Sequence, residues 1–192
     1  MQKTKKKIGG LWIPCPILEF FKSHKISAKE VILCSLIFNF QRQGKGCFVT
    51  IRWFAEKLSV GEQQANMMLI NLKRLNLIEN SRKNGRSPYR RLQYELKEAC
   101  MLSVRHKQSL WVPRNYIHEF FERRIDAKEL LLLTVVRSYH QKEGCSLSNS
   151  QFADHLCLSY DTISSMISNL RRRGLLEIVG FNGRKRWLLS CV

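Results

Sequence analysis

Two segments of the chain pair an apolar face with a face of amide, hydroxyl and basic side chains. In residues 62–75 and 160–173, apolar residues recur at spacings of three and four, which predicts helices with a polar outer stripe. The stripes carry Gln63, Gln64, Asn66, Lys73 and Arg74 in the first segment, and Tyr160, Thr162, Ser165, Ser168, Arg171 and Arg172 in the second. Asn and Gln can make two hydrogen bonds to an adenine edge, Ser and Thr read bases less selectively, and Lys and Arg bind phosphate. The chemistry indicated is base and phosphate recognition.

Each of these segments is followed by a predicted hairpin with a basic loop. The expected strands are Leu77–Glu79 with Tyr89–Leu96, and Leu175–Ile178 with Arg186–Leu189. Each loop contains an Asn-Gly pair, which tolerates the positive φ angles of a tight hairpin. The basic residues of the two hairpins are Arg82, Lys83, Arg86, Arg90 and Arg91, and Arg184, Lys185 and Arg186. We interpret them as phosphate contacts in preference to a plain solvated face.

Charged residues at the ends of the two segments allow a second interpretation. Glu62 and Asp161 lie in the first turn, where a carboxylate stabilises the helix dipole; acceptance of a hydrogen bond from cytosine is the less favoured alternative. Arg171–Arg173 can equally complement the dipole at a solvated helix end. The nearby basic run of the second hairpin favours a phosphate clamp.

The chain repeats itself at an offset of about a hundred residues, a period that suits a duplicated domain better than a solenoid. Leu11–Pro14 returns as Leu110–Pro113, and Ile26–Glu30 returns as Ile125–Glu129. The correspondence continues through both polar-faced segments. Two copies of one module in one chain predict a built-in pseudo-dimer.

The elements that position the polar-faced segments follow the same order in each half. We expect a short helix, a buried central helix capped by Ser27 or Asp126, a short strand and a second short helix capped by Thr50 or Ser148. The predicted ranges are 16–22, 28–41, 47–49 and 51–58, and 114–122, 127–141, 145–147 and 149–156. Trp12 and Trp111 are interpreted as core anchors, each closing its own module.

This order of helices and hairpin resembles the winged helix-turn-helix family. The run Ile167–Leu176 resembles the family's pattern of apolar-x-x-Leu-x-x-Arg-Gly-Leu-Ile, and the first copy departs from it by carrying Asn76 in place of Gly. The resemblance implies an α+β, mainly α fold of two tandem winged-helix domains. The predicted organisation is a basic flexible N-terminal tail at 1–10, domain 1 at 11–98, a linker at 99–109 and domain 2 at 110–192. It also implies recognition helices in the major groove and basic wings on neighbouring phosphates.

The composition favours nucleic acid as the partner. The 192 residues carry a net charge of +18, with a pI near 10.0. Residues 1–98 contain 19 Lys and Arg against 7 Asp and Glu, and residues 99–192 contain 14 against 8, so both halves can face phosphate. The longest apolar patch near the N-terminus is too short for a signal peptide or membrane span. We therefore expect a cytoplasmic protein with no membrane partner.

Enzymatic and metal chemistry have little support in the sequence. There is no glycine-rich phosphate loop, no His-x-x-x-His pair and no Cys-x-x-Cys pair, and the seven cysteines are scattered. We expect no enzyme activity, no cofactor and no metal site, with reduced and mostly buried thiols.

These observations lead to a specific expectation with several possible roles. The chain is expected to bind double-stranded DNA in a sequence-specific manner, as a monomeric pseudo-dimer or a homodimer, with recognition helices about 34 Å apart on unequal half-sites. A transcriptional regulator of a bacterial mobile element is the first role considered. The alternatives are a plasmid or phage replication initiator, an accessory factor in DNA processing or conjugation with a protein partner, and a protein-binding module.

Overall fold

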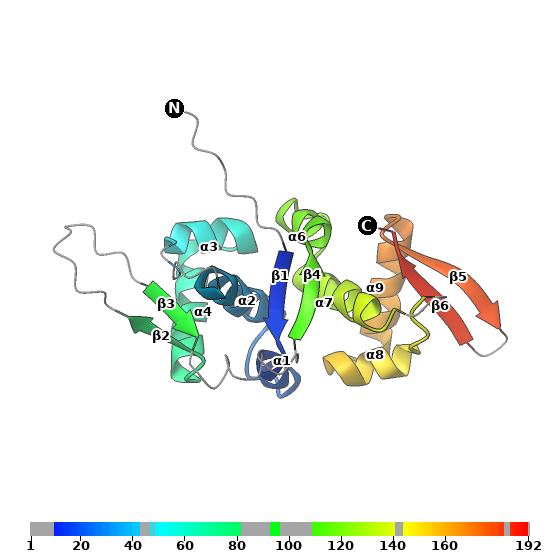
Figure 1. Cartoon of the computed structure of the whole chain (residues 1–192), viewed down its shortest axis with the longest axis horizontal. Coiled ribbons are helices and arrows are strands. Elements are labelled where there is room, and N and C mark those ends of the chain that lie inside the picture. The colour runs from blue at the N-terminus through cyan, green and yellow to red at the C-terminus, as the bar shows by residue number, and fades with distance from the viewer. Residues whose placement is uncertain are drawn as a thin grey trace, which may run out of the picture.

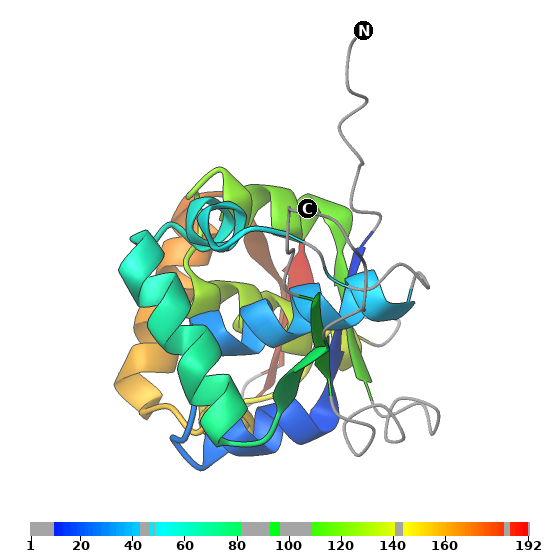
Figure 2. The same cartoon turned by 90° about the vertical axis from the view of Figure 1, so that its left-hand side faces the viewer.

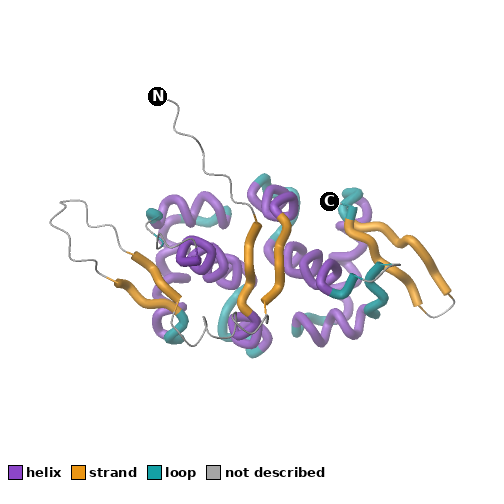
Figure 3. The backbone as a smooth tube through the Cα atoms, in the orientation of Figure 1, coloured by secondary structure: helices purple, strands orange, loops and turns teal. Residues whose placement is uncertain are grey.

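The protein is α+β and mainly helical, with helices grouped on either side of a central pair of strands (Figure 1). The computed structural model describes residues 10–42, 47, 49–81, 93–96, 109–140, 144–182 and 185–191, with the backbone alone for 80, 81, 93–96, 181, 182 and 185. These residues form eight helices and three two-stranded antiparallel sheets. Figure 3 shows one sheet at the centre of the long axis and one at each end.

The two halves of the chain have the same order of elements, as the sequence repeat predicts. The first half contains β1 (Gly10–Pro14), α1 (Cys15–Lys22), α2 (Ala28–Arg42), α3 (Ile51–Leu58), α4 (Glu62–Arg74), β2 (Ile78–Ser81) and β3 (Gln93–Leu96). The second contains β4 (Ser109–Pro113), α6 (Arg114–Phe121), α7 (Ala127–Ser138), α8 (Asn149–Leu156), α9 (Tyr160–Arg172), β5 (Leu176–Asn182) and β6 (Lys185–Ser190). Helix α7 ends three residues earlier than its predicted limit.

Side-chain caps determine where several helices begin. Thr50 accepts a hydrogen bond from the backbone N–H of Trp53, which starts α3, and Ser148 accepts from that of Gln151, which starts α8. Asp126 and Glu129 cap α7 reciprocally. Each cap satisfies backbone N–H groups that the first helical turn leaves without partners. The predicted caps at these three helix starts are confirmed.

Helices α2 and α7 are the buried centres of their halves. Nearly all positions from Val31 to Phe38 and from Leu130 to Val136 are buried, on every side of each helix. This burial confirms the expectation drawn from their continuous apolar runs. The two helices also pack against each other, so the halves share one continuous core.

Strands β1 and β4 join the two halves across a pseudo-twofold axis. They pair antiparallel with Trp12 opposite Trp111, and the two rings lie tilted at 52° with centroids 4.8 Å apart. Leu11 pairs with Val112, and Ile13 pairs with Leu110. Since Leu110 and Val112 are the repeats of Leu11 and Ile13, this register is symmetric about the Trp12–Trp111 pair. The tryptophans are therefore half-buried partners at the joint between halves, and the interpretation of each as an anchor of its own module was wrong.

The hairpins form with some differences from the predicted strands. Strands β2 and β3 pair antiparallel, as do β5 and β6, and Asn182 pairs with Lys185 as part of the second ladder rather than lying in the turn. The predicted short strand at 145–147 is reduced to a single bridge between Cys145 and Leu188. At the ends of α4 and α9, Asn76 and Gly174 both have positive φ, 62° and 69°, so Asn replaces Gly there as expected.

Candidate nucleic-acid interface

The outer face of α4 is exposed along its whole length. Its inner face is buried through Ala65, Met68, Leu69 and Leu72, as the spacing predicted. The side chains of Gln63, Gln64, Asn66 and Arg74 are exposed, and Lys73 is partly exposed. The predicted polar residues therefore occupy one accessible surface.

Two exposed residues on this face are apolar and were not among the predicted site residues. Met67 is 62% exposed and Ile70 is 47% exposed. They follow Gln63 by four and seven residues, so these three side chains and Arg74 form one ridge opposite the buried face. The sequence could have predicted their exposure, because neither residue falls at the three- and four-residue spacing of the buried positions.

The outer face of α9 carries the corresponding ridge in different chemistry. Helices α4 and α9 have 13 residues each, so Met67 corresponds to Ser165 and Ile70 to Ser168. Ser165, Ser168, Arg171 and Arg172 are exposed. Ile163, Met166, Ile167 and Leu170 are buried, as predicted. The ridge of α9 therefore carries hydroxyl and basic side chains, whereas the ridge of α4 carries amide, apolar and basic side chains.

One predicted base-reading residue of α9 is already engaged within the protein. Thr162 is half-buried, its backbone N–H donates to the Ser159 side chain, and the two hydroxyl groups are 2.7 Å apart. Thr162 thus takes part in capping the helix. Tyr160, by contrast, is 58% exposed at the same helix start.

Both ridged helices lie on one face of the molecule. Figure 1 places α4 and α9 at opposite ends of the long axis, on either side of β1 and β4. In Figure 2, which is turned by 90°, both helices lie on the left, whereas β1 and β4 lie toward the right. The two helices that carry the exposed ridges therefore lie on the same side of the molecule.

Basic groups gather where the second hairpin meets α9. Arg186 on β6 is half-buried and donates a hydrogen bond to the Asn149 side chain at the start of α8. Burial lowers the pKa of the Arg186 guanidinium; the nearby Tyr160 opposes this shift, and the positive charge of Arg171 adds to it. Arg186 therefore anchors the root of the hairpin beside α9, and an anion bound there would relieve its repulsion from Arg171.

Arg173, directly after α9, binds groups within the protein. Its Nη1 atom donates to Glu129 Oε2 at 3.2 Å and to the carbonyl oxygen of Arg124. Glu129 is only 4% exposed, so this pair stabilises a carboxylate buried between α7 and α9. The side chain of Arg173 is still 46% exposed, and its part in a phosphate clamp with Arg171 and Arg172 stays a prediction. In the first half, the equivalent carboxylate belongs to Glu30, whose Oε1 atom accepts a hydrogen bond from Asn71 Nδ2 at 2.7 Å.

Most of the predicted wing residues lie outside the described residues. This applies to Arg82, Lys83, Arg86, Arg90, Arg91 and Arg184, and the side chain of Lys185 is likewise not described. The structure places the strands that lead to them at the two ends of the long axis (Figure 3).

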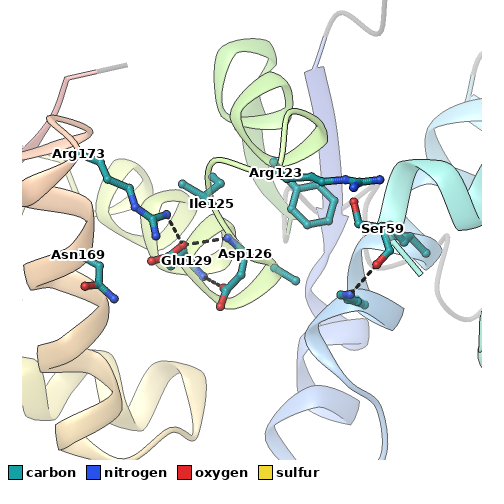
Figure 4. A pocket seen from close by; sticks show the side chains of 11 residues that line it. Ser59, Arg123, Ile125, Asp126, Glu129, Asn169 and Arg173 are labelled. Atoms are coloured by element: carbon teal, nitrogen blue, oxygen red, sulfur yellow. Dashed lines mark hydrogen bonds and ion pairs between the residues drawn. The ribbon is translucent and has the colours of Figure 1, made fainter. Parts of the chain in front are cut away.

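A pocket of about 350 Å³ lies between the halves, and several of its charged side chains bind other groups of the protein (Figure 4). Lys29 Nζ donates to the Ser59 carbonyl oxygen at 3.3 Å, and Glu129 binds Arg173. Asp126 accepts the backbone N–H of Glu129 as a helix cap. These bonds engage Lys29, Asp126 and Glu129 within the protein, and Arg123 also lines the pocket.

The described part of the chain lacks other signs of a reactive centre. No group of three His, Cys, Asp or Glu side chains gathers there as a metal site would need. Burial raises the pKa of the Cys47 thiol to about 12, so this cysteine is a poor nucleophile near neutral pH. No helix in these segments has both the length and the apolar character needed to cross a bilayer.

Comparisons with known proteins add little to this picture. No family model matches the chain, and no curated protein matches it. Among solved structures, the DIP2311 protein from Corynebacterium diphtheriae aligns over 84% of this chain with 16% identity and a TM-score of 0.26. The chain spans 26% of the length of that protein. A likeness at this TM-score supports no conclusion about fold or function.

Proposed function

We propose that this chain is a sequence-specific double-stranded DNA-binding protein made of two winged-helix modules. The observation that carries the proposal is the pair of exposed ridges on α4 and α9, two helices that lie on the same side of the molecule. Helices of this width fit the major groove of B-DNA, and two of them on one face can enter successive major grooves. The net charge of +18 supports a polyanionic partner.

We expect the ridge of α4 to contact base edges and the end of the α9 ridge to contact phosphate. Gln63, Gln64 and Asn66 lie in the first turns of α4, where the helix would enter the groove and amide groups would meet base edges. Arg171 and Arg172 lie at the far end of α9, beside the root of the second hairpin, where they would meet phosphate. Because the two ridges differ, the two half-sites should differ as well.

Selection of bound fragments from the source genome tests this proposal. The purified full chain is mixed with genomic duplex fragments at physiological salt, with single-stranded DNA and RNA as competitors. We expect one bipartite motif whose halves are about one helical turn apart. Its position beside a promoter, an origin repeat or a transfer origin would distinguish regulation, replication and DNA transfer.

A matched pair of variants tests the base-reading helix. Gln63→Ala with Gln64→Ala should relax the preference at the half-site under α4, while Asn115→Ala on α6 should leave the motif unchanged. Asn115 is exposed on α6, which directly follows β4 and carries neither ridge. A uniform loss of affinity across all sequences, with the motif retained, would contradict base reading by these residues. Failure to enrich any duplex would contradict the proposed function itself.

A further inference from the structure

The ridge of α4 contains an apolar pair that helix packing does not require. Met67 and Ile70 are 62% and 47% exposed, while the buried face of the same helix is complete without them. Large apolar side chains at the centre of an otherwise polar ridge lose favourable burial unless a partner covers them.

The second half of the chain shows that the fold does not need apolar residues here. The equivalent positions on α9 are Ser165 and Ser168, and both are exposed. The two helices have the same length, the same buried spacing and the same place about the pseudo-twofold axis. The apolar pair is therefore a property of the first module's outer surface.

The neighbours of the pair indicate what covers it. Gln63 lies one turn before Met67 and Arg74 lies one turn after Ile70, so amide, apolar and basic groups follow each other along one ridge. In the major groove an A·T pair presents the adenine edge, which suits an amide, together with the thymine methyl group, which suits an apolar side chain. A protein partner of the usual kind would need a larger apolar patch than two side chains flanked by amide and basic groups.

We propose that Met67 and Ile70 contact thymine methyl groups and make the half-site under α4 rich in A·T pairs. The half-site under α9, which is read by serines, lacks this dependence on methyl groups. This inference rests on the proposed function, because it assigns the base preference of the same interface.

Replacement of thymine by uracil tests the contact directly, since uracil pairs identically and lacks only the methyl group. The probe is the duplex that the full chain selects, with deoxyuridine placed at one thymine at a time. Each contacted methyl group that is removed should weaken binding about fourfold, from about 0.8 kcal/mol for one buried carbon at 1.4 kcal/mol per tenfold change. The sensitive positions should fall in one half-site only.

The variant Met67→Ser with Ile70→Ser copies the α9 ridge onto α4 and should abolish the uracil effect. Both residues are exposed, so the variant should fold, which circular dichroism would verify. The control, Asn115→Ala, changes an exposed residue outside both ridges and should keep the full effect. Duplex binding with no uracil-sensitive position, or equal sensitivity in the Met67/Ile70 variant, would overturn the thymine contact and leave the proposed function standing. Absence of duplex binding would instead overturn both.

Discussion

Neutralisation of Arg171 and Arg172 should lower the affinity for DNA and weaken its dependence on salt concentration. Both side chains are exposed at the end of α9, and neither supports the core as Arg173 does. The variant Arg171→Gln with Arg172→Gln removes two positive charges and keeps side chains of similar length. Because Gln is also a good helix former, α9 should remain intact.

The expected size of the effect follows from the release of counterions. Each phosphate that a protein neutralises contributes about −0.9 to the slope of log K against log salt on B-DNA. Two lost contacts should make the slope less negative by about 1.8. The same relation gives about 60-fold weaker binding at 0.1 M salt, a difference that disappears on extrapolation to 1 M.

Titration of a labelled duplex at several salt concentrations measures both quantities. The control variant Arg114→Gln removes one exposed charge at the start of α6, directly after β4 and outside both ridges. Its slope should match that of the unmodified protein. An unchanged slope in the double variant would refute phosphate contact at the end of α9, and an equal change per charge in the control would mean that overall charge drives binding.

Two further predictions concern groups in the core. Arg173→Leu should lower the free energy of unfolding by about 1–3 kcal/mol in urea titrations, because Glu129 then keeps a buried carboxylate without its charged partner. The control Arg172→Gln should change the free energy of unfolding by less than about 0.5 kcal/mol. Equal effects of the two variants would contradict the stabilising role of the Arg173–Glu129 pair. Burial raises the pKa of the Cys47 thiol from 9.0 to about 12, so the folded state favours the protonated thiol. The stability that this preference contributes is fully present below pH 9. Between pH 9 and 12, the free energy of unfolding should fall by up to about 1.4 kcal/mol per pH unit. The variant Cys47→Ala should show a smaller decline over this range, and an identical decline would contradict the assignment.

Short-range interactions explain why much of the fold could be predicted. The starts of α3, α7 and α8 depend on Thr50, Asp126 and Ser148, whose bonds reach only three residues along the chain. The buried faces of α4 and α9 follow from apolar spacing, and the turn at Asn76 follows from its tolerance of positive φ. The sequence by itself thus determined the helices, their order and the two polar faces.

Only the tertiary structure decided how the two halves meet and which polar side chains stay available. The pairing of Trp12 with Trp111 joins strands that lie far apart in the chain, and no local pattern encodes a partner at that separation. Arg173 and Arg186 read alike as basic residues in the sequence, yet packing of α7 and α8 beside them supplies Glu129 and Asn149 as partners. Burial and long-range hydrogen bonding arise from the assembled core, so they separate structural side chains from exposed ones only once the chain has folded.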